Sequence, residues 1–241
     1  MKWVRDRTGR FSERPYYQPE ELDDECERLI TEFLRARHGN VEFPIITDDL
    51  TVLVEQAGAA FDPYTDFSAD KRNVDGLTTF VPGCKPLVQI ARRLSENPRY
   101  ENRMRTTISH EVGHVWFHGP LWRAQQASGH PLIGGSKMTH LCRRETIVDA
   151  PGSDWAEWQA GYVSGALLMP ASYLWEVIRR FLAREPLFRD PLPMRIDSRV
   201  GHRLIHEVMD VFAVSEEAAK IRLLRQHVLT EEDAVQGNLF A

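Results

Sequence analysis

Residues 106–118 read TTISHEVGHVWFH and contain the pentapeptide HEVGH, from His110 to His114. In an α-helix, residues four positions apart lie one turn apart on the same face, so these two histidines can direct imidazole nitrogens at one cation. Glu111 can then reach a water molecule on that cation and act as a general base. Gly113 lies in the same segment, where glycine destabilises a helix by about 1 kcal/mol relative to alanine. This glycine indicates that another group approaches the helix closely.

A catalytic zinc site usually has three protein ligands and one open position, so a third ligand must come from elsewhere in the chain. The pattern H-E-x-x-H-x-x-G-x-x-H is excluded, because Phe117 and Pro120 stand where it needs glycine and histidine. His118 lies too far along the helix axis to be a ligand, and we expect it to support the site or to face a substrate. The acidic candidates downstream are Glu145, Asp149, Asp154, Glu157 and Glu176.

Glu157 has the most favourable surroundings of these candidates, within DWAEWQAGYVSGALLMP at 154–170. It shares one helical face with the small residues Ala160, Gly161 and Ser164. Small residues let two helix backbones approach closely, and a carboxylate needs that approach to reach a metal on a neighbouring helix. The alternative is a surface glutamate on a tightly packed helix. The predicted site consists of the metal ligands His110, His114 and Glu157 and the base Glu111.

The composition narrows the class of protein. Hydrophobic residues make up 42% and charged residues 27% of the 241 residues, as in ordinary globular proteins. A net charge of −5 argues against a protein that coats nucleic acid. Apolar runs are too short to cross a bilayer, the N-terminus does not resemble a signal peptide, and three scattered cysteines do not form a disulfide framework. We therefore expect a cytoplasmic protein that does not enter the membrane.

Local patterns predict the order of the elements. Residues 1–17 are basic and predict a mobile arm. Helices are predicted at 19–37 and 48–57, the second capped by Thr47. A tight turn at 75–76 precedes short strands at 77–81 and 87–90.

Further along, a helix opened by Asn97-Pro98 carries the histidine motif and ends at Gly119-Pro120. Residues 119–153 predict a long loop or insertion, and an apolar helix follows at 154–169. The predicted organisation is a domain over 18–185, a helical unit over 186–230 and a tail over 231–241.

HEVGHVWFH and EWQAGYVSGALLMP resemble the ImmA/IrrE metallopeptidases, whose pattern joins H-E-x-x-H to a later E-x-x-A-N ahead of L-L-M-P. The similarity extends upstream through PIITDDLTVLVEQAG, GLTTFVPGCKPLVQI and RMRTTISHE, and covers residues 40–230. This sequence departs from the family at Gly161, where asparagine is usual, and in the length of the 119–153 segment.

The resemblance implies an α+β fold with a zincin-like metallopeptidase domain, built from helices and a small sheet of short strands. It also implies Zn²⁺, or another divalent transition metal, held by His110, His114 and Glu157, with Glu111 as the catalytic base. Members of the family act on DNA-binding repressors. A protein substrate of that kind, and control of transcription through its cleavage, are therefore what the resemblance implies here.

The C-terminal segment RVGHRLIHEVMDVFAVSEEAAKIRLLRQ, residues 199–226, predicts two helices separated by a break at FAVS, with Ser215 as the cap of the second. This is a helix-turn-helix-like layout. From Arg195 to Val228 there are six Lys or Arg and five Asp or Glu residues, so the basic face of a DNA-binding unit is weak. We expect this unit to contact the peptidase domain or a partner protein more than nucleic acid.

Two functions fit these patterns. In a zinc endopeptidase, a substrate segment would pair with an edge strand near residues 77–90, and Tyr162 is one candidate for the donor that stabilises the oxyanion. The alternative is a non-catalytic regulator in which the metal stabilises the fold and the protein binds a repressor-like or antitoxin-like partner or DNA. A structural zinc site is closed by four protein ligands, so the number of ligands distinguishes the two functions.

Overall fold

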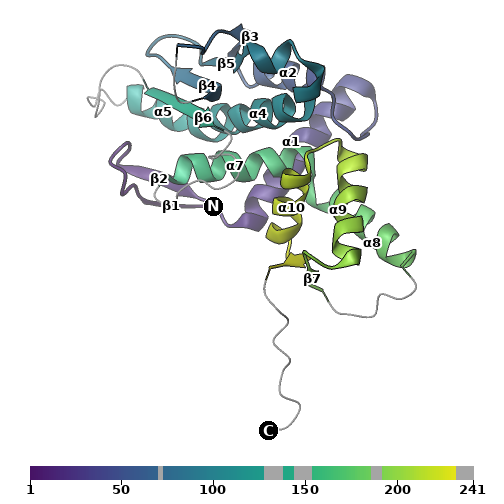
Figure 1. Cartoon of the computed structure of the whole chain (residues 1–241). Coiled ribbons are helices and arrows are strands. Elements are labelled where there is room, and N and C mark those ends of the chain that lie inside the picture. Colours follow the sequence, from purple (N-terminus) through teal and green to yellow (C-terminus); the bar gives the residue numbers. More distant parts are fainter. Residues whose placement is uncertain (70–72, 128–137, 144–153, 186–191, 232–241) are drawn as a thin grey trace. The chain divides into compact units, whose positions relative to one another are not determined.

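The chain forms two compact units, Met1–Pro170 and Ala171–Ala241, each described separately below. The structure is a computed structural model, and it describes residues 1–69, 73–127, 138–143, 154–185 and 192–231 (Figure 1). The fold is mixed α+β, as predicted. The boundary between the units lies earlier than the predicted boundary at 185–186, because α8 (Ala171–Ala183) packs against α9 (Arg199–Phe212) of the C-terminal unit.

The first unit contains a four-stranded sheet in the order β3-β5-β4-β6. The strands are β3 (Ala60–Thr65), β4 (Val74–Phe80), β5 (Leu87–Ala91) and β6 (Met138–Arg143). β3 and β5 are parallel, and the other pairs are antiparallel. The two predicted strands correspond to β4 and β5.

The predicted tight turn at Asp75-Gly76 is wrong, because both residues lie within β4. Asp75 is completely buried, and its carboxylate forms ion pairs with Arg93 and Arg103. A buried carboxylate is stable in a strand only when such partners neutralise it. These partners are distant in sequence, so the local Asp-Gly signal predicted a turn.

The two N-terminal helices are α1 (Pro19–His38) and α2 (Thr47–Gln56), close to the predicted ranges. Gly39 ends α1 in the left-handed conformation, with φ +81°, which glycine adopts without strain. Thr47 is the first residue of α2, and Ile46 is the N-cap, so the predicted capping role of Thr47 is wrong. The Thr47 hydroxyl instead donates a hydrogen bond to Glu101.

The helix with the histidine motif is longer than predicted. Short helices α3 (Arg92–Ser95) and η1 (Pro98–Tyr100) lead into α4 (Glu101–Gly113), the π-helical turn η2 (His114–His118) and α5 (Gly119–Ala127). The predicted stop at Gly119-Pro120 is therefore wrong. In η2 the Gly119 N–H donates to the carbonyls of His114 and Val115, and this wider turn gives the proline ring room that an α-helix does not give.

The segment predicted as one long loop, residues 119–153, contains both α5 and β6. That prediction is wrong for these two stretches. Residues 128–137 and 144–153 of the segment lie outside the described residues.

A two-stranded hairpin takes the place of the mobile arm that residues 1–17 predict. It consists of β1 (Lys2–Arg5) and β2 (Glu13–Tyr16), which are antiparallel. Phe11 is buried against Trp155, and Arg10 forms two hydrogen bonds of 2.7–2.8 Å with Asp154. The partners that hold the hairpin are about 150 residues away in the sequence, so composition alone does not reveal them.

Helix α7 (Trp155–Leu168) lies against α4, which in Figure 1 runs between the sheet and α7. A Cβ atom added at Gly113 of α4 would be 3.1 Å from the Cα of Ala160 and 3.3 Å from the Cβ of Val163. The Ser164 hydroxyl donates a 2.9 Å hydrogen bond to the carbonyl of Thr106. The glycine therefore permits the close helix packing that the sequence indicated.

In the C-terminal unit, α9 and α10 (Glu216–Arg225) are separated by a short break, as predicted. The Ser215 hydroxyl accepts a hydrogen bond from the N–H of Ala218 and caps α10. The short strands β7 (Met194–Arg195) and β8 (Leu229–Thr230) pair in parallel. Beyond Glu231, the predicted tail lies outside the described residues. No helix within the described ranges is long and apolar enough to cross a membrane.

Substitution of Gly113 by alanine tests the close contact between α4 and α7. Gly119→Ala is a matched control, because a Cβ at Gly119 meets its nearest neighbours at an ordinary 3.5–3.7 Å. Both substitutions gain about 1 kcal/mol of helix propensity. We expect the free energy of unfolding of Gly113→Ala, from chemical denaturation, to be about 1–3 kcal/mol lower than that of Gly119→Ala. Equal stabilities would contradict a tight contact at Gly113.

Candidate metal centre

The three predicted metal ligands lie together in the structure. His110 is in the last turn of α4, His114 begins η2, and Glu157 is in the first turn of α7. Asp154 caps α7 by accepting a hydrogen bond from the N–H of Glu157, at 3.4 Å. This cap fixes the start of the helix, and the close packing at Gly113 brings that helix to the histidines.

The distances within this group fit a metal ion. The Nε2 atoms of His110 and His114 are 3.1 Å apart. The Glu157 carboxylate lies 3.2 Å from Nε2 of His110 and 3.4 Å from Nε2 of His114. Zinc–ligand bonds of about 2.0–2.1 Å in a tetrahedral site place neighbouring ligand atoms roughly 3.3–3.4 Å apart. The group His110, His114 and Glu157 is therefore able to hold a metal ion.

The other acidic candidates have different surroundings. Asp154 forms an ion pair with Arg10 in addition to capping α7. Glu176 is in α8 of the C-terminal unit, where it forms an exposed ion pair with Arg180. Glu145 and Asp149 lie outside the described residues. Among the described candidates, Glu157 is the carboxylate that joins the histidines.

His118 supports the site from behind His114. Its Nδ1 atom lies 3.0 Å from Nδ1 of His114, and its Nε2 atom lies 3.1 Å from Oε1 of Gln159. The Gln159 amide donates a 3.3 Å hydrogen bond to the carbonyl of Pro15 in β2. The side chains of His114, His118 and Gln159 are almost completely buried. The sequence had suggested this supporting role for His118, but not the roles of Gln159 and the hairpin.

A metal ion at this site would set the direction of the hydrogen bonds from His114 to His118 and from His118 to Gln159. If Nε2 of neutral His114 presents its lone pair to a cation, Nδ1 carries the proton and donates it to Nδ1 of His118. His118 is then protonated at Nε2 and donates to the Gln159 carbonyl oxygen. Each of these two donors then has an acceptor. His118 fixes the orientation of His114, as supporting residues commonly do for metal-binding histidines.

Glu111 is completely buried and faces strand β4. The Thr78 hydroxyl donates a 2.5 Å hydrogen bond to its Oε2 atom. A Cβ at Gly76 would lie 2.6 Å from its Oε1 atom, so a side chain at position 76 would displace the carboxylate. Sequence analysis missed Gly76 and Thr78, although a glycine inside a strand is a known sign of close approach.

The electrostatics of the site centre on His110. Burial disfavours the charged form of the ring, but the hydrogen bond with Glu157 and the charges of Glu157 and Glu111 oppose that effect. Together they raise the pKa of His110 above its ordinary value. A proton and a metal cation therefore compete for the same nitrogen.

The expectation that Tyr162 faces a substrate is wrong, and the expected edge strand near residues 77–90 is neither β4 nor β5. The Tyr162 hydroxyl is buried and donates a 3.0 Å hydrogen bond to Asp23 of α1, so it is engaged with α1 instead of facing a substrate. Strands β4 and β5, which contain residues 77–80 and 87–90, are both internal to the sheet. Among the described strands, β3 and β6 form the edges of the sheet, and β6 lies next to β4 although it is more than 40 residues beyond β5 in the sequence.

Comparisons with known proteins leave the site to be interpreted from its own chemistry. No protein-family model matches the chain, and no curated protein matches it. Two imidazoles and a carboxylate form a donor set that is able to hold a metal ion, and a second buried carboxylate, Glu111, is adjacent in sequence to His110.

Replacing Glu157 by glutamine tests the predicted carboxylate ligand. The neutral amide keeps the shape of the side chain but removes the negative charge that attracts the cation. We expect zinc affinity, measured by competition with a chromogenic chelator, to fall by more than the roughly 10–100-fold loss that is typical when a residue supporting a ligand is removed. Glu20→Gln, at an exposed position on α1, is the control. An unchanged affinity in Glu157→Gln would remove Glu157 from the ligand set.

Substitutions of His118 test its positioning role. His118→Leu removes the acceptor for Nδ1–H of His114, and we expect zinc affinity to fall about 10–100-fold. His118→Asn places an amide oxygen near the position of Nδ1, so we expect it to restore most of the affinity. If leucine and asparagine at this position bind zinc equally well, His118 does not orient His114 through a hydrogen bond.

Proposed function

We propose that this protein is a zinc-dependent endopeptidase with a zincin-like, ImmA/IrrE-type domain, which cleaves a DNA-binding repressor or a similar regulatory protein and so controls transcription. One observation carries the proposal. The carboxylate of Glu157 meets the two histidines of HEVGH at 3.2 and 3.4 Å, and this motif also supplies an acidic residue suited to be the base. A metal site with a separate buried acid beside it matches what peptide hydrolysis requires.

Zinc suits the donor set, because two nitrogen ligands and one carboxylate are typical of catalytic zinc sites with one open position. Within the described residues, three side chains form the group, and no fourth His, Cys, Asp or Glu joins them. When bound, zinc polarises a carbonyl group and lowers the pKa of a water molecule to about 7. This number of ligands favours a catalytic site over a closed structural one.

Glu111 is the proposed general base. Its carboxylate accepts a proton from the attacking water and then returns the proton to the amine that leaves. Thr78 and Gly76 fix the carboxylate: the threonine donates a hydrogen bond to one oxygen, and the glycine leaves room for the other. His118 and Gln159 keep His114 in the tautomer that offers Nε2.

The edge of the sheet at β6 is the proposed binding position for an extended substrate. β6 pairs with β4 on one side, and β4 carries the two residues that contact Glu111. An added strand would obtain main-chain hydrogen bonds from the edge, as in other cases of strand addition. A repressor as the source of that strand follows from the sequence resemblance, not from the site.

Burial of the site favours a second candidate function, a non-catalytic regulator in which the metal stabilises the fold. His110, His114 and Glu111 are completely buried, and Glu157 is 6% exposed. A substrate would need an opening at Glu157 to reach the ligands. In this alternative, the protein acts by binding a repressor-like or antitoxin-like partner or DNA, and Glu111 contributes only to the stability of the protein.

Glu111→Gln separates the two functions. The zinc-loaded protein and this variant are incubated with the proteome of the source cell, and new N-termini are quantified by mass spectrometry. We expect Glu111→Gln to retain zinc and to lose hydrolysis by about 10²–10⁴-fold, the usual contribution of a general base.

Glu55→Gln, at an exposed position on α2, is the control and should cleave at the wild-type rate. Undiminished hydrolysis by zinc-loaded Glu111→Gln would reject Glu111 as the base. A zinc-loaded wild-type protein that releases no new N-termini would favour the regulator.

A further inference from the structure

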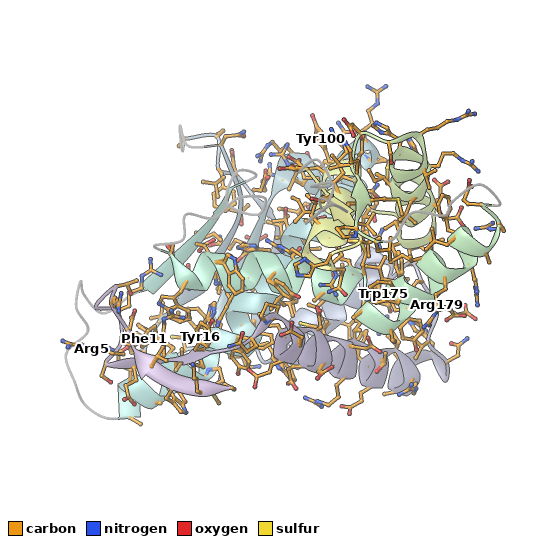
Figure 2. All side chains as sticks on the ribbon, turned by 90° about the horizontal axis from the view of Figure 1, so that it is seen from below. Arg5, Phe11, Tyr16, Tyr100, Trp175 and Arg179 are labelled. Atoms are coloured by element: carbon orange, nitrogen blue, oxygen red, sulfur yellow. The ribbon has the colours of Figure 1, made fainter. Side chains whose placement is uncertain are left out.

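A basic cleft of about 780 Å³ lies at the N-terminal hairpin. Lys2 and Arg14 line it from the paired strands, and Arg7 lines it from the turn between them. Trp155, the first residue of α7, also lines the cleft. Arg5, at the end of β1, also lines the cleft. Figure 2 shows Arg5 pointing away from the end of the hairpin.

Among the described residues, carboxylates balance the positive charges of this basic cleft only through longer-range interactions, such as that of Glu21 with Lys2. None of the described residues that line it is acidic. Within the described part of the chain, no carboxylate forms an ion pair with Lys2, Arg5, Arg7 or Arg14. Glu13 is opposite Arg5 in the strand register but does not line the cleft. Four cations gathered on a protein of net charge −5 create a local field that attracts an anionic partner.

The aromatic rings in the cleft are already covered. Lys2 and Arg14 lie over the ring of Tyr16, at 5.1 and 5.9 Å from its centroid. Arg14 also lies 5.0 Å from the Trp155 ring. Binding of single-stranded nucleic acid relies on aromatic faces that are free to stack bases. The rings here instead hold the cations in place, which favours a partner that offers carboxylates over one that offers bases.

The basic cleft is next to the metal centre. The Trp155 ring contacts His118 edge to face, with ring centroids 5.1 Å apart, and Glu157 follows two residues later in α7. The Pro15 carbonyl of the same hairpin accepts the last hydrogen bond of the series that runs from His114 through His118 and Gln159. A chain bound in the cleft would therefore lie beside the side chains that support the metal ligands.

We propose that the basic cleft binds an acidic segment of the polypeptide substrate, adjacent in sequence to the bond that is cleaved. Guanidinium groups bind carboxylates with two parallel hydrogen bonds, and the exposed Arg5 and Arg7 are placed to do so. The identification of this partner as a substrate depends on the proposed peptidase function. The binding itself does not depend on hydrolysis, so the two proposals fail separately.

The test measures binding to the full-length Glu111→Gln protein, so that a bound peptide is not cleaved. The probes are a fluorescein-labelled (Glu-Gly-Ser)₄ peptide, the matched (Gln-Gly-Ser)₄ peptide and a dT₂₀ oligonucleotide, each followed by fluorescence anisotropy. The charge-reversal variant is Arg5→Glu/Arg7→Glu. Its control is Arg99→Glu/Arg179→Glu, which changes the net charge equally at two exposed positions; Figure 2 shows Arg179 on the C-terminal unit.

We expect the glutamate peptide to bind about tenfold more tightly than the glutamine peptide, and Arg5→Glu/Arg7→Glu to weaken it at least about tenfold. The Arg99→Glu/Arg179→Glu control should change binding by less than about twofold. If circular dichroism shows that the reversal variant does not fold, Arg5→Gln/Arg7→Gln takes its place. This variant removes the two charges without reversing them, so we expect a smaller loss of affinity for the glutamate peptide.

Three results would overturn the inference: equal affinity for the two peptides, an equal loss in the control variant, or tighter binding of the oligonucleotide that depends on Arg5 and Arg7. Failure of the peptidase proposal gives a different pattern. In that case the wild-type protein releases no new N-termini, while the glutamate peptide still binds and still requires the two arginines.

Discussion

The short distance between α4 and α7 is the constraint on which the candidate metal centre depends. A glutamate side chain is short, and Glu157 lies within 3.2–3.4 Å of both histidine nitrogens because Gly113 lets the backbone of Ala160 approach. The hydrogen bond from Ser164 to the Thr106 carbonyl holds the same two helices together further along. The contact between Gly113 and Ala160 thus sets both the helix packing and the geometry of the ligands, so a change in one changes the other.

The site is assembled from parts of the chain that are far apart in sequence. Strand β4 holds Glu111 through Thr78 and Gly76, and Asp75 in the same strand forms ion pairs with Arg93 and Arg103. These ion pairs tie β4 to α3 and to α4, the helix that carries His110. A buried, low-dielectric site strengthens each electrostatic interaction and makes any unpaired polar group costly. His114 meets that requirement through His118 and Gln159, whereas the buried Nδ1 atom of His110 has no hydrogen-bond partner among the described residues.

The N-terminal hairpin serves the centre on two sides. Its inner side provides the Pro15 carbonyl that accepts from Gln159 and the buried Phe11 that packs on Trp155. Its outer side presents the cations of the basic cleft. Trp155 contacts both sides, since its ring lies edge to face with His118 and the Arg14 guanidinium lies over the same ring. This arrangement connects the proposed docking of a substrate with the orientation of a metal ligand.

The sequence by itself determined what depends on local periodicity: the ranges of α1, α2 and α7, the cap at Ser215, the paired histidines one turn apart and Glu157 on a face of small residues. It failed at Asp75-Gly76, at Gly119-Pro120 and in the hairpin. Partners distant in sequence decide two of these stretches, because Arg93 and Arg103 pair with Asp75, and Asp154 and Trp155 hold the hairpin. At Gly119-Pro120, the wider π-helical turn that precedes the proline lets the helix continue. Only the tertiary structure brought the carboxylate to the histidines and Gln159 to His118, because the distance between two helices is set by packing, which periodicity does not encode.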